Sequence, residues 1–255
     1  MAERRVSRVV ESTRRAFIGG VAAAVTGGPA AADDPYAQAR AGMVANIRQL
    51  VSAGAAGKVR GLDPRVLQTM GEVPRHLFVA AGLRSRAYRD EALEIGDGAT
   101  ISQPFMVALM THLARPKSTD AALEVGTGSG YQAAVLSRLV RQVYTIEIIG
   151  PLATEASGRL AALGYSNVEV RQRDGYQGWP ERGPFDIILV TAGATSTPPA
   201  LVRQLKPGGR MIIPVGRMGR QELLVHEKDA RGRMRTTSVA WVDFVPLVRS
   251  RPGRP

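Results

Sequence analysis

The sequence predicts an α/β fold: a doubly wound, mostly parallel sheet of seven strands, with a helical extension on its N-terminal side. Three observations predict it. Between residues 121 and 215, short apolar runs of strand length alternate with helical patterns, as in a parallel sheet with helices on both faces. Two further runs, joined by a charged turn, favour an antiparallel hairpin at the sheet edge. Helical spacing of apolar residues before residue 115 predicts the extension.

The extension begins with a predicted helix over residues 36–53, which carries apolar side chains at helical spacing and ends at glycine. Asp63 followed by Pro64 is typical of a second helix start. The aspartate side chain can cap the free N–H groups, and proline at the first helical position lacks only an N–H that would have no partner. We therefore expect a second helix to begin at Pro64.

Ser102 follows a loop marked by Gly96 and Gly98 and precedes Pro104. From spacing alone, the favoured role of Ser102 is to cap a helix that starts near Pro104. The free N–H groups of a helix start also attract anions, so a substrate contact is compatible with that role.

The sheet and its helices follow in chain order. Glycine turns at 207–209 and after Asp174 separate elements in this part of the chain. The predicted strands are 121–125, 143–147, 167–171, 185–190, 210–215, 222–226 and 237–244, and the predicted helices between them include 151–163 and 199–205.

Residues 1–32 are predicted to be a twin-arginine export signal. The segment Ser12–Ile18 holds paired arginines before Phe17 and Ile18, a mildly apolar run follows, and three alanines end at Ala32. The mature chain would then begin at Asp33, outside the cytoplasm. The alternative is a disordered basic arm on a cytoplasmic protein.

The remaining chain is predicted to form one domain over residues 33–248, followed by a tail over 249–255. Residues 33–115 would form a helical part that contacts the substrate, and residues 116–248 the sheet that binds a cofactor. The apolar run near the N-terminus is far shorter than the ~20 residues of a membrane helix, so no stable membrane insertion is expected.

Composition limits the chemistry. The chain has no cysteine, and its three histidines lie far apart in sequence, so thiolate catalysis is excluded and a metal site is not expected. The net charge is +12, from 34 Lys and Arg against 22 Asp and Glu. Because the basic residues in the middle of the chain are scattered, we favour a solvated basic surface over a nucleic-acid interface.

The stretch 121–132 indicates the cofactor class. An apolar strand ends in Gly126, Gly128 and Gly130, and a helical pattern follows. A dinucleotide-binding turn has the pattern G-x-G-x-x-G, whereas Tyr131 holds the last of those positions here. A G-x-G-x-G turn preceded by an acid suits S-adenosylmethionine, which carries positive charge and no phosphate.

Three acidic residues, Glu124, Glu147 and Asp174, fall at the carboxyl ends of successive predicted strands, where ligands bind in such sheets. Glu147 lies 17 residues after Gly130, close to the spacing of a ribose-binding acid. The alternatives are a plain strand-end charge for Glu147 and an ordinary β-turn for Asp174 and Gly175.

Seven segments carry a family resemblance, and the most specific of them is Thr100-Ile-Ser-Gln-Pro104. The segments are 73–79, 100–108, 123–132, 175–178, 184–186, 214–216 and 244–247. They resemble the protein-L-isoaspartate O-methyltransferases, a family of class I S-adenosylmethionine-dependent enzymes with a Rossmann-like fold. The resemblance covers roughly residues 40 to 248.

The resemblance implies methyl transfer to the α-carboxyl of L-isoaspartyl residues in damaged proteins, and we expect a monomer that acts on such proteins. The family's functional serine falls on Ser102. The residues implied to bind S-adenosylmethionine are Thr100, Ile101, Glu124, Gly126, Thr127, Gly128, Gly130, Glu147, Asp174 and Gly175.

Three alternatives remain: a class I methyltransferase for a small carboxylate or amine, a non-catalytic protein that binds S-adenosylmethionine, and a dehydrogenase. The first is disfavoured by the segment around Ser102, the second by intact Glu124, Glu147 and Ser102, and the third by Tyr131.

Overall fold

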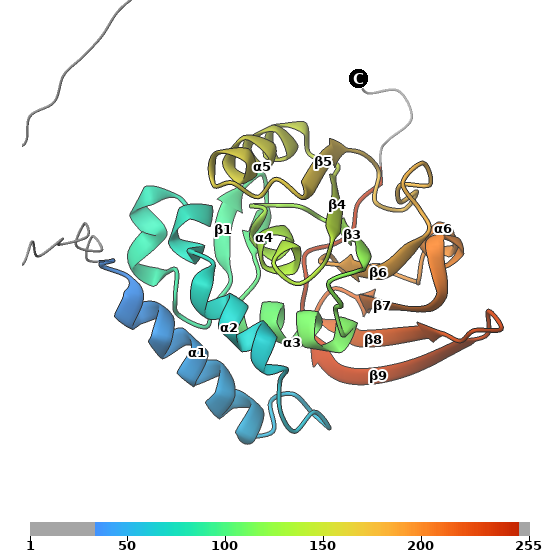
Figure 1. Ribbon diagram of the computed structural model, residues 1–255, viewed down its shortest axis with the longest axis horizontal. Helices are drawn as coiled ribbons and strands as arrows, with labels where there is room; N and C mark the ends of the chain where they lie inside the picture. The colour runs from blue at the N-terminus through green and yellow to red at the C-terminus, as the bar shows by residue number, and fades with distance from the viewer. Residues whose placement is uncertain (1–33, 250–255) are drawn as a thin grey trace, which may run out of the picture. The chain divides into compact units, whose positions relative to one another are not determined.

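A computed structural model describes residues 34–249 (Figure 1). The chain divides into two units, and the fold described below is the second, which begins at Tyr36. The predicted export signal, residues 1–32, lies outside the described residues. The predicted boundary between residues 115 and 116 stays a prediction.

The predicted sheet is confirmed. Its seven strands have the order β5-β4-β3-β6-β7-β8-β9. The first five in that order pair in parallel, and β8 pairs antiparallel with both β7 and β9 at one edge (Figure 1). The bounds are β3 Ala121–Val125, β4 Gln142–Glu147, β5 Val168–Gln172, β6 Phe185–Val190, β7 Leu205–Arg217, β8 Arg220–Lys228 and β9 Met234–Val242.

The helices come largely from the first half of the chain. The extension holds α1, α2 and α3, together with two short 3-10 helices, while α4 and α5 follow β3 and β4. The bounds are α1 Ala37–Ser52, α2 Pro64–Glu72, η1 Arg75–Phe78, η2 Ala81–Arg86, α3 Pro104–Ala114, α4 Tyr131–Ser137, α5 Gly150–Ala162 and α6 Pro199–Gln204.

Each face of the sheet has its own core, because successive strand side chains point to opposite faces. In β6, Ile187 and Leu189 join the core made with the helices α1 to α5, whereas Ile188 and Val190 join the opposite core with Trp179 and α6. The alternation fixes the register of the central strands, since a slip of one residue would exchange the two cores.

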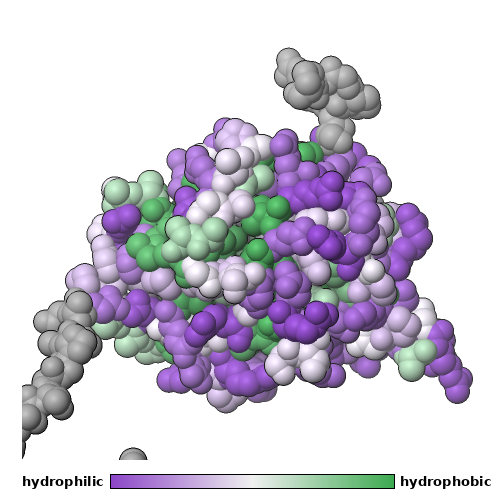
Figure 2. Space-filling view, turned by 45° about the horizontal axis from the view of Figure 1, so that its top comes forward, coloured by the Kyte–Doolittle hydropathy of each residue, from purple (hydrophilic) through white to green (hydrophobic). Residues whose placement is uncertain are grey.

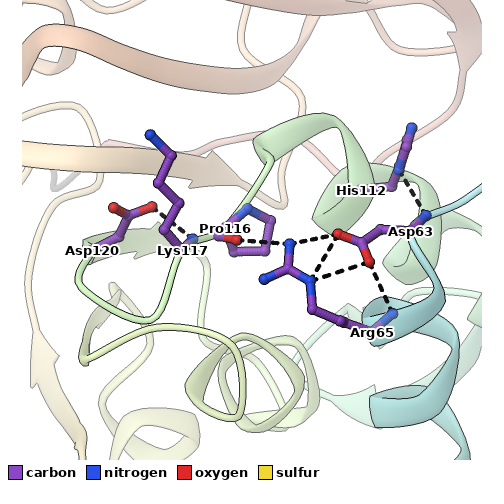
Figure 3. Close-up of polar contacts among 6 residues, drawn as sticks. All are labelled: Asp63, Arg65, His112, Pro116, Lys117 and Asp120. Carbon is purple, nitrogen blue, oxygen red and sulfur yellow. Dashed lines mark hydrogen bonds and ion pairs between the residues drawn. The ribbon is translucent and has the colours of Figure 1, made fainter.

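The start of α2 confirms the role predicted for Asp63 and is tied to the end of α3 (Figure 3). The Asp63 carboxylate accepts a hydrogen bond of 2.9 Å from the backbone N–H of Arg65. It also forms an ion pair of 2.6 Å with the guanidinium of Arg65. The hydrogen bonds from Arg65 hold the pKa of Asp63 below its usual value. His112 Nδ1 accepts from the Asp63 N–H at 3.0 Å, so this histidine has a structural role.

Three sequence expectations need correction. Ser102 does not cap α3: the N-cap is Gln103, and the outside acceptor for the helix start is the Asp90 carboxylate. The glycine loop after residue 92 is the turn of a hairpin, β1 Leu93–Gly96 and β2 Ala99–Ile101. Strand β7 begins at Leu205, because the segment 207–209 forms an irregularity within the strand, not a turn before it.

The surface is mixed. Most of the face in Figure 2 is hydrophilic, and hydrophobic residues gather mainly in one area of it. Within residues 34–249, no helix combines the length and the apolar character that crossing a membrane requires.

Candidate active site

The glycine turn lies between β3 and α4, at the carboxyl edge of the parallel strands. Gly126, Gly128 and Gly130 all have positive φ, at 99°, 50° and 87°. The N–H groups of Gly126 and Thr127 donate to the Ile146 carbonyl at the end of β4, at 2.8 and 3.2 Å. The turn is therefore fixed to the neighbouring strand, and its backbone is open to close approach by a ligand.

Gly126 is the tightest position in this turn. A Cβ there would lie 2.6 Å from Thr191 Oγ1, which donates to the Gly126 carbonyl at 2.6 Å. We expect Gly126→Ala to lower the free energy of unfolding by about 1–2 kcal/mol or more, because the backbone is left-handed and space is lacking. Urea unfolding would measure this.

Gly158 offers the matched control for that substitution. It lies in the exposed part of α5, and a Cβ there would meet no atom within 4 Å. We expect Gly158→Ala to leave stability unchanged or to raise it by about 0.5–1 kcal/mol. Equal effects of the two substitutions would contradict the assignment of strain to Gly126.

Glu147 ends β4 and holds the backbone on both sides of the site. Its Oε2 accepts from the Gly128 N–H at 2.9 Å, and its Oε1 accepts from the N–H groups of Ile148 and Ile149 at 2.9 and 3.1 Å. These three bonds fix the carboxylate, and the remaining lone pair on Oε2 can accept a hydrogen bond from a ribose hydroxyl.

Glu124 is a buried carboxyl group on β3. Thr127 and Thr145 share a hydrogen bond of 2.7 Å, and the Thr145 hydroxyl donates to Glu124 Oε2 at 2.6 Å. Glu124 Oε1 has no partner in the described part of the chain, and the side chain is fully buried. Burial raises the pKa of Glu124 to about 8, opposed by the Thr145 hydrogen bond and aided by the charge of Glu147. An unpaired buried oxygen in this place favours a cationic ligand.

These groups line one cavity of about 210 Å³ at the carboxyl ends of the strands. Gly130 and Asp174 are predicted site residues that do not line it. Gly130 starts α4 and allows close packing against Leu160, and Asp174 accepts from the Tyr176 N–H at 2.8 Å. The predicted residues that do line it are Thr100, Ile101, Ser102, Glu124, Gly126, Thr127, Gly128, Glu147 and Gly175.

Two walls of the cavity were missed from the sequence. One is the turn of the β1–β2 hairpin, beside which Ile95 of β1 packs 3.2 Å from the place of a Cβ on Gly128; of this hairpin, only Thr100 and Ile101 of β2 were predicted. The Asp97-Gly98 dipeptide at its tip, between alternating residues, is a recognised hairpin signal that could have found it. The other is the segment 245–248, which is held by hydrogen bonds to Gly193. Residues 244–247 carry part of the family resemblance, but no local pattern places the segment on the cavity, because its position depends on distant contacts.

Ser102 lies on the same cavity, between β2 and α3. It is partly buried, and its hydroxyl has no hydrogen-bond partner among residues 34–249. Since capping of α3 does not use it, the hydroxyl is available to a substrate that enters beside the glycine turn.

The cavity fits S-adenosylmethionine. Glu147 supplies hydrogen-bond acceptors, Glu124 supplies a buried carboxyl group that a cation would ionise, and Ile148 and Ile149 supply an apolar wall. Arg173 is the only basic residue among those that line the cavity in the described chain, and it is paired with Glu181 at 2.7 Å. A phosphate group would therefore find no free cation on these walls.

The sheet order, the glycine turn and the acid at the end of β4 define a class I S-adenosylmethionine-dependent methyltransferase. The family model described as protein-L-isoaspartate(D-aspartate) O-methyltransferase matches residues 49–252. The chain belongs to this family.

Proteins of similar sequence carry the name of the same family. The chain is 55% identical over 227 residues to protein-L-isoaspartate O-methyltransferase 2 of Syntrophobacter fumaroxidans, covering 88% of this chain and 92% of the relative. It is 53% identical over 220 residues to the Cupriavidus necator enzyme numbered 1, covering 86% and 85%.

Two solved structures of the family superpose with TM-scores of 0.69 and 0.66. The first is 28% identical and covers 80% of this chain and 65% of that chain. The second, from Plasmodium falciparum in complex with S-adenosyl-L-homocysteine, is 25% identical and covers 82% and 99%.

Proposed function

We propose that this enzyme transfers a methyl group from S-adenosylmethionine to the α-carboxyl of L-isoaspartyl residues in proteins, as a step of protein repair. The family supports the reaction. The observation that carries it is the placement of Ser102, whose hydroxyl has no partner within residues 34–249 and lies on the cavity that Glu124 and Glu147 also line.

The cofactor residues act by holding charge and position. S-adenosylmethionine supplies a methyl group on a positively charged sulfur, which makes that carbon the electrophile. Glu147, fixed by three backbone N–H groups, holds the ribose, and Glu124 offers its free oxygen to positive charge. The glycine turn lets the ligand lie against backbone.

The substrate needs no general base in this proposal. A carboxylate with a pKa near 4 is already ionised at neutral pH and is itself the nucleophile. Ser102 donates a hydrogen bond to this carboxylate and aligns it for in-line attack, and alignment is where most of the rate enhancement arises.

Methyl transfer from labelled S-adenosylmethionine to an isoaspartyl peptide tests the proposal, with the matching aspartyl peptide as control. We expect label on the isoaspartyl peptide alone. Equal labelling of the two peptides, or transfer only to small carboxylates or amines, would replace the proposal with another methyltransferase activity.

The raised pKa of Glu124 predicts a pH dependence of cofactor binding. Below about pH 8 the carboxyl holds a proton in the free enzyme, and a cation favours its ionised form. Binding therefore releases a proton, and Kd should fall as pH rises from 6 to 8, by up to about tenfold per pH unit. Calorimetry in two buffers of different ionisation enthalpy would measure the released proton. Glu124→Gln should abolish the release, and a wild-type enzyme that releases none would contradict the assignment.

Two further proposals come from the sequence. Residues 1–32 act as a twin-arginine export signal, and an intact N-terminus on protein purified from its native host would refute this. The enzyme acts as a monomer, and sedimentation at working concentration tests that.

A further inference from the structure

The start of α3 has an unusual cap. Pro104 holds the first helical position and has no N–H, and the Met106 and Val107 N–H groups bond to the Gln103 carbonyl. Phe105 is left with an N–H that needs an outside acceptor. The Asp90 carboxylate, 15 residues earlier, takes this bond at 2.7 Å through Oδ1.

The second oxygen of Asp90 holds the residue next to Ser102. Gln103 Nε2 donates to Asp90 Oδ2 at 3.1 Å. One carboxylate therefore fixes the side chain directly after Ser102 and a backbone group three residues after it. Asp90 satisfies the helix start, and Ser102 lies on the cavity.

Arg75 holds the turn that carries Asp90 by a hydrogen bond to its backbone. Arg75 is fully buried, and its Nε donates to the Ala87 carbonyl at 2.7 Å. Its guanidinium lies 4.8 Å from the ring centre of Tyr131, which lines the cavity directly after the glycine turn. Burial lowers the pKa of Arg75, and its interactions with Tyr131 and Asp90 oppose that shift. Arg75 thus contacts both the cofactor side and the segment that leads to Ser102.

We propose that Asp90 is a positioning residue for Ser102: it caps α3 in place of the serine and so keeps the hydroxyl free to bind the substrate carboxylate. The inference rests on the proposed role of Ser102. Without Asp90, the Phe105 N–H would need a new acceptor. Ser102 lies three residues earlier, the spacing at which a serine hydroxyl caps a helix start, and its hydroxyl has no partner among the described residues. Small displacements of an aligning group cost much rate in a reaction that depends on position.

The first test compares Asp90→Ala with Glu91→Ala. Glu91 is the neighbouring carboxylate, lies at the surface, and its side chain pairs with Arg86 at 2.7 Å, so its removal makes the same charge change without touching α3. We expect Asp90→Ala to raise KM for an isoaspartyl peptide about tenfold, with Kd for S-adenosylhomocysteine within about twofold of wild type. Glu91→Ala should match wild type in both.

A double-mutant cycle separates positioning from general destabilisation. If Asp90 acts through Ser102, Asp90→Ala should have little further effect on kcat/KM in a Ser102→Ala background. A loss of the same factor in both backgrounds would overturn the inference. So would a parallel loss of cofactor affinity, or an Asp90→Ala enzyme with wild-type KM.

Two conservative variants complete the test. Asp90→Asn keeps an acceptor for Phe105, and the Gln103 amide can reverse to match it, so we expect it to restore most of the activity. Asp90→Glu keeps the charge but moves the carboxylate by one methylene. If Asp90→Ala does not fold, Asp90→Glu takes its place in the double-mutant cycle.

The outcomes distinguish this inference from the proposed function. Wild-type enzyme that methylates no isoaspartyl peptide overturns both. If the wild-type enzyme is active and Ser102→Ala is equally active, Ser102 does not contact the substrate, and the inference about Asp90 fails with it. Loss in Ser102→Ala with an additive effect of Asp90→Ala refutes the inference alone.

Discussion

Ser102→Ala is expected to lose about 10- to 100-fold in kcat/KM for an isoaspartyl peptide while its affinity for S-adenosylhomocysteine stays at the wild-type value. The lost interaction is one hydrogen bond to a charged group, which contributes about 1.5–3 kcal/mol. Cofactor affinity is spared because the hydroxyl has no partner in the described protein and supports none of the bonds around Glu147. Initial rates with labelled cofactor and calorimetric titration measure the two quantities.

The control for Ser102→Ala is Ser157→Ala. Ser157 is exposed on α5 and does not line the cavity, and its substitution by alanine removes the same hydroxyl group. It should keep wild-type rates. A Ser102→Ala enzyme with wild-type kcat/KM would refute the substrate contact, and one with weakened cofactor binding would place Ser102 on the cofactor instead.

The parts of the site that the sequence predicted are those set by local pattern. Strand-length apolar runs placed Glu124 and Glu147 at the ends of β3 and β4, and parallel pairing then brings these ends together. The three glycines of the turn all have positive φ, which glycine tolerates better than other residues. Such features depend on a few consecutive residues, so a single sequence contains them.

The parts that the sequence did not predict depend on contacts between distant residues. The segment 245–248 lies on the cavity because Gln221 makes two hydrogen bonds to the Phe244 backbone, at 2.8 and 3.0 Å, across 23 positions. The room for Gln221 comes from Gly193, where a Cβ would collide with its side-chain amide. A glutamine, a glycine and a phenylalanine at such separations have no period that could indicate their contact.

The wrong role for Ser102 has the same origin. A serine two residues before a proline is a good cap by local rules, and those rules do not see a carboxylate from another segment. Asp90 competes for the same N–H with an ionised acceptor at 2.7 Å, so the tertiary contact prevails over the local preference. The disagreement falls at the residue to which we assign the substrate contact.

Glu147→Ala is expected to weaken binding of S-adenosylhomocysteine about 100-fold. The substitution removes the carboxylate that would accept the ribose hydroxyls, and it also frees the N–H groups of Gly128, Ile148 and Ile149. Each lost hydrogen bond to a charged group contributes about 1.5–3 kcal/mol, so one or two of them account for the factor. Calorimetric titration of wild type and variant would give the ratio of the two Kd values.

Two comparisons make this result specific to the site. Glu72→Ala removes an exposed carboxylate at the end of α2, outside the cavity, and should bind the cofactor as wild type does. Glu147→Gln keeps one acceptor oxygen but sets an amide N–H against the Gly128 N–H, so its affinity should fall between wild type and Glu147→Ala. Equal affinity in wild type and Glu147→Ala would defeat the ribose assignment. In that event Glu147 would be a structural strand-end charge. Glu124 and Asp97 would be the remaining acidic residues on the walls of the cavity in the described chain, and Glu124 has the buried oxygen without a partner there.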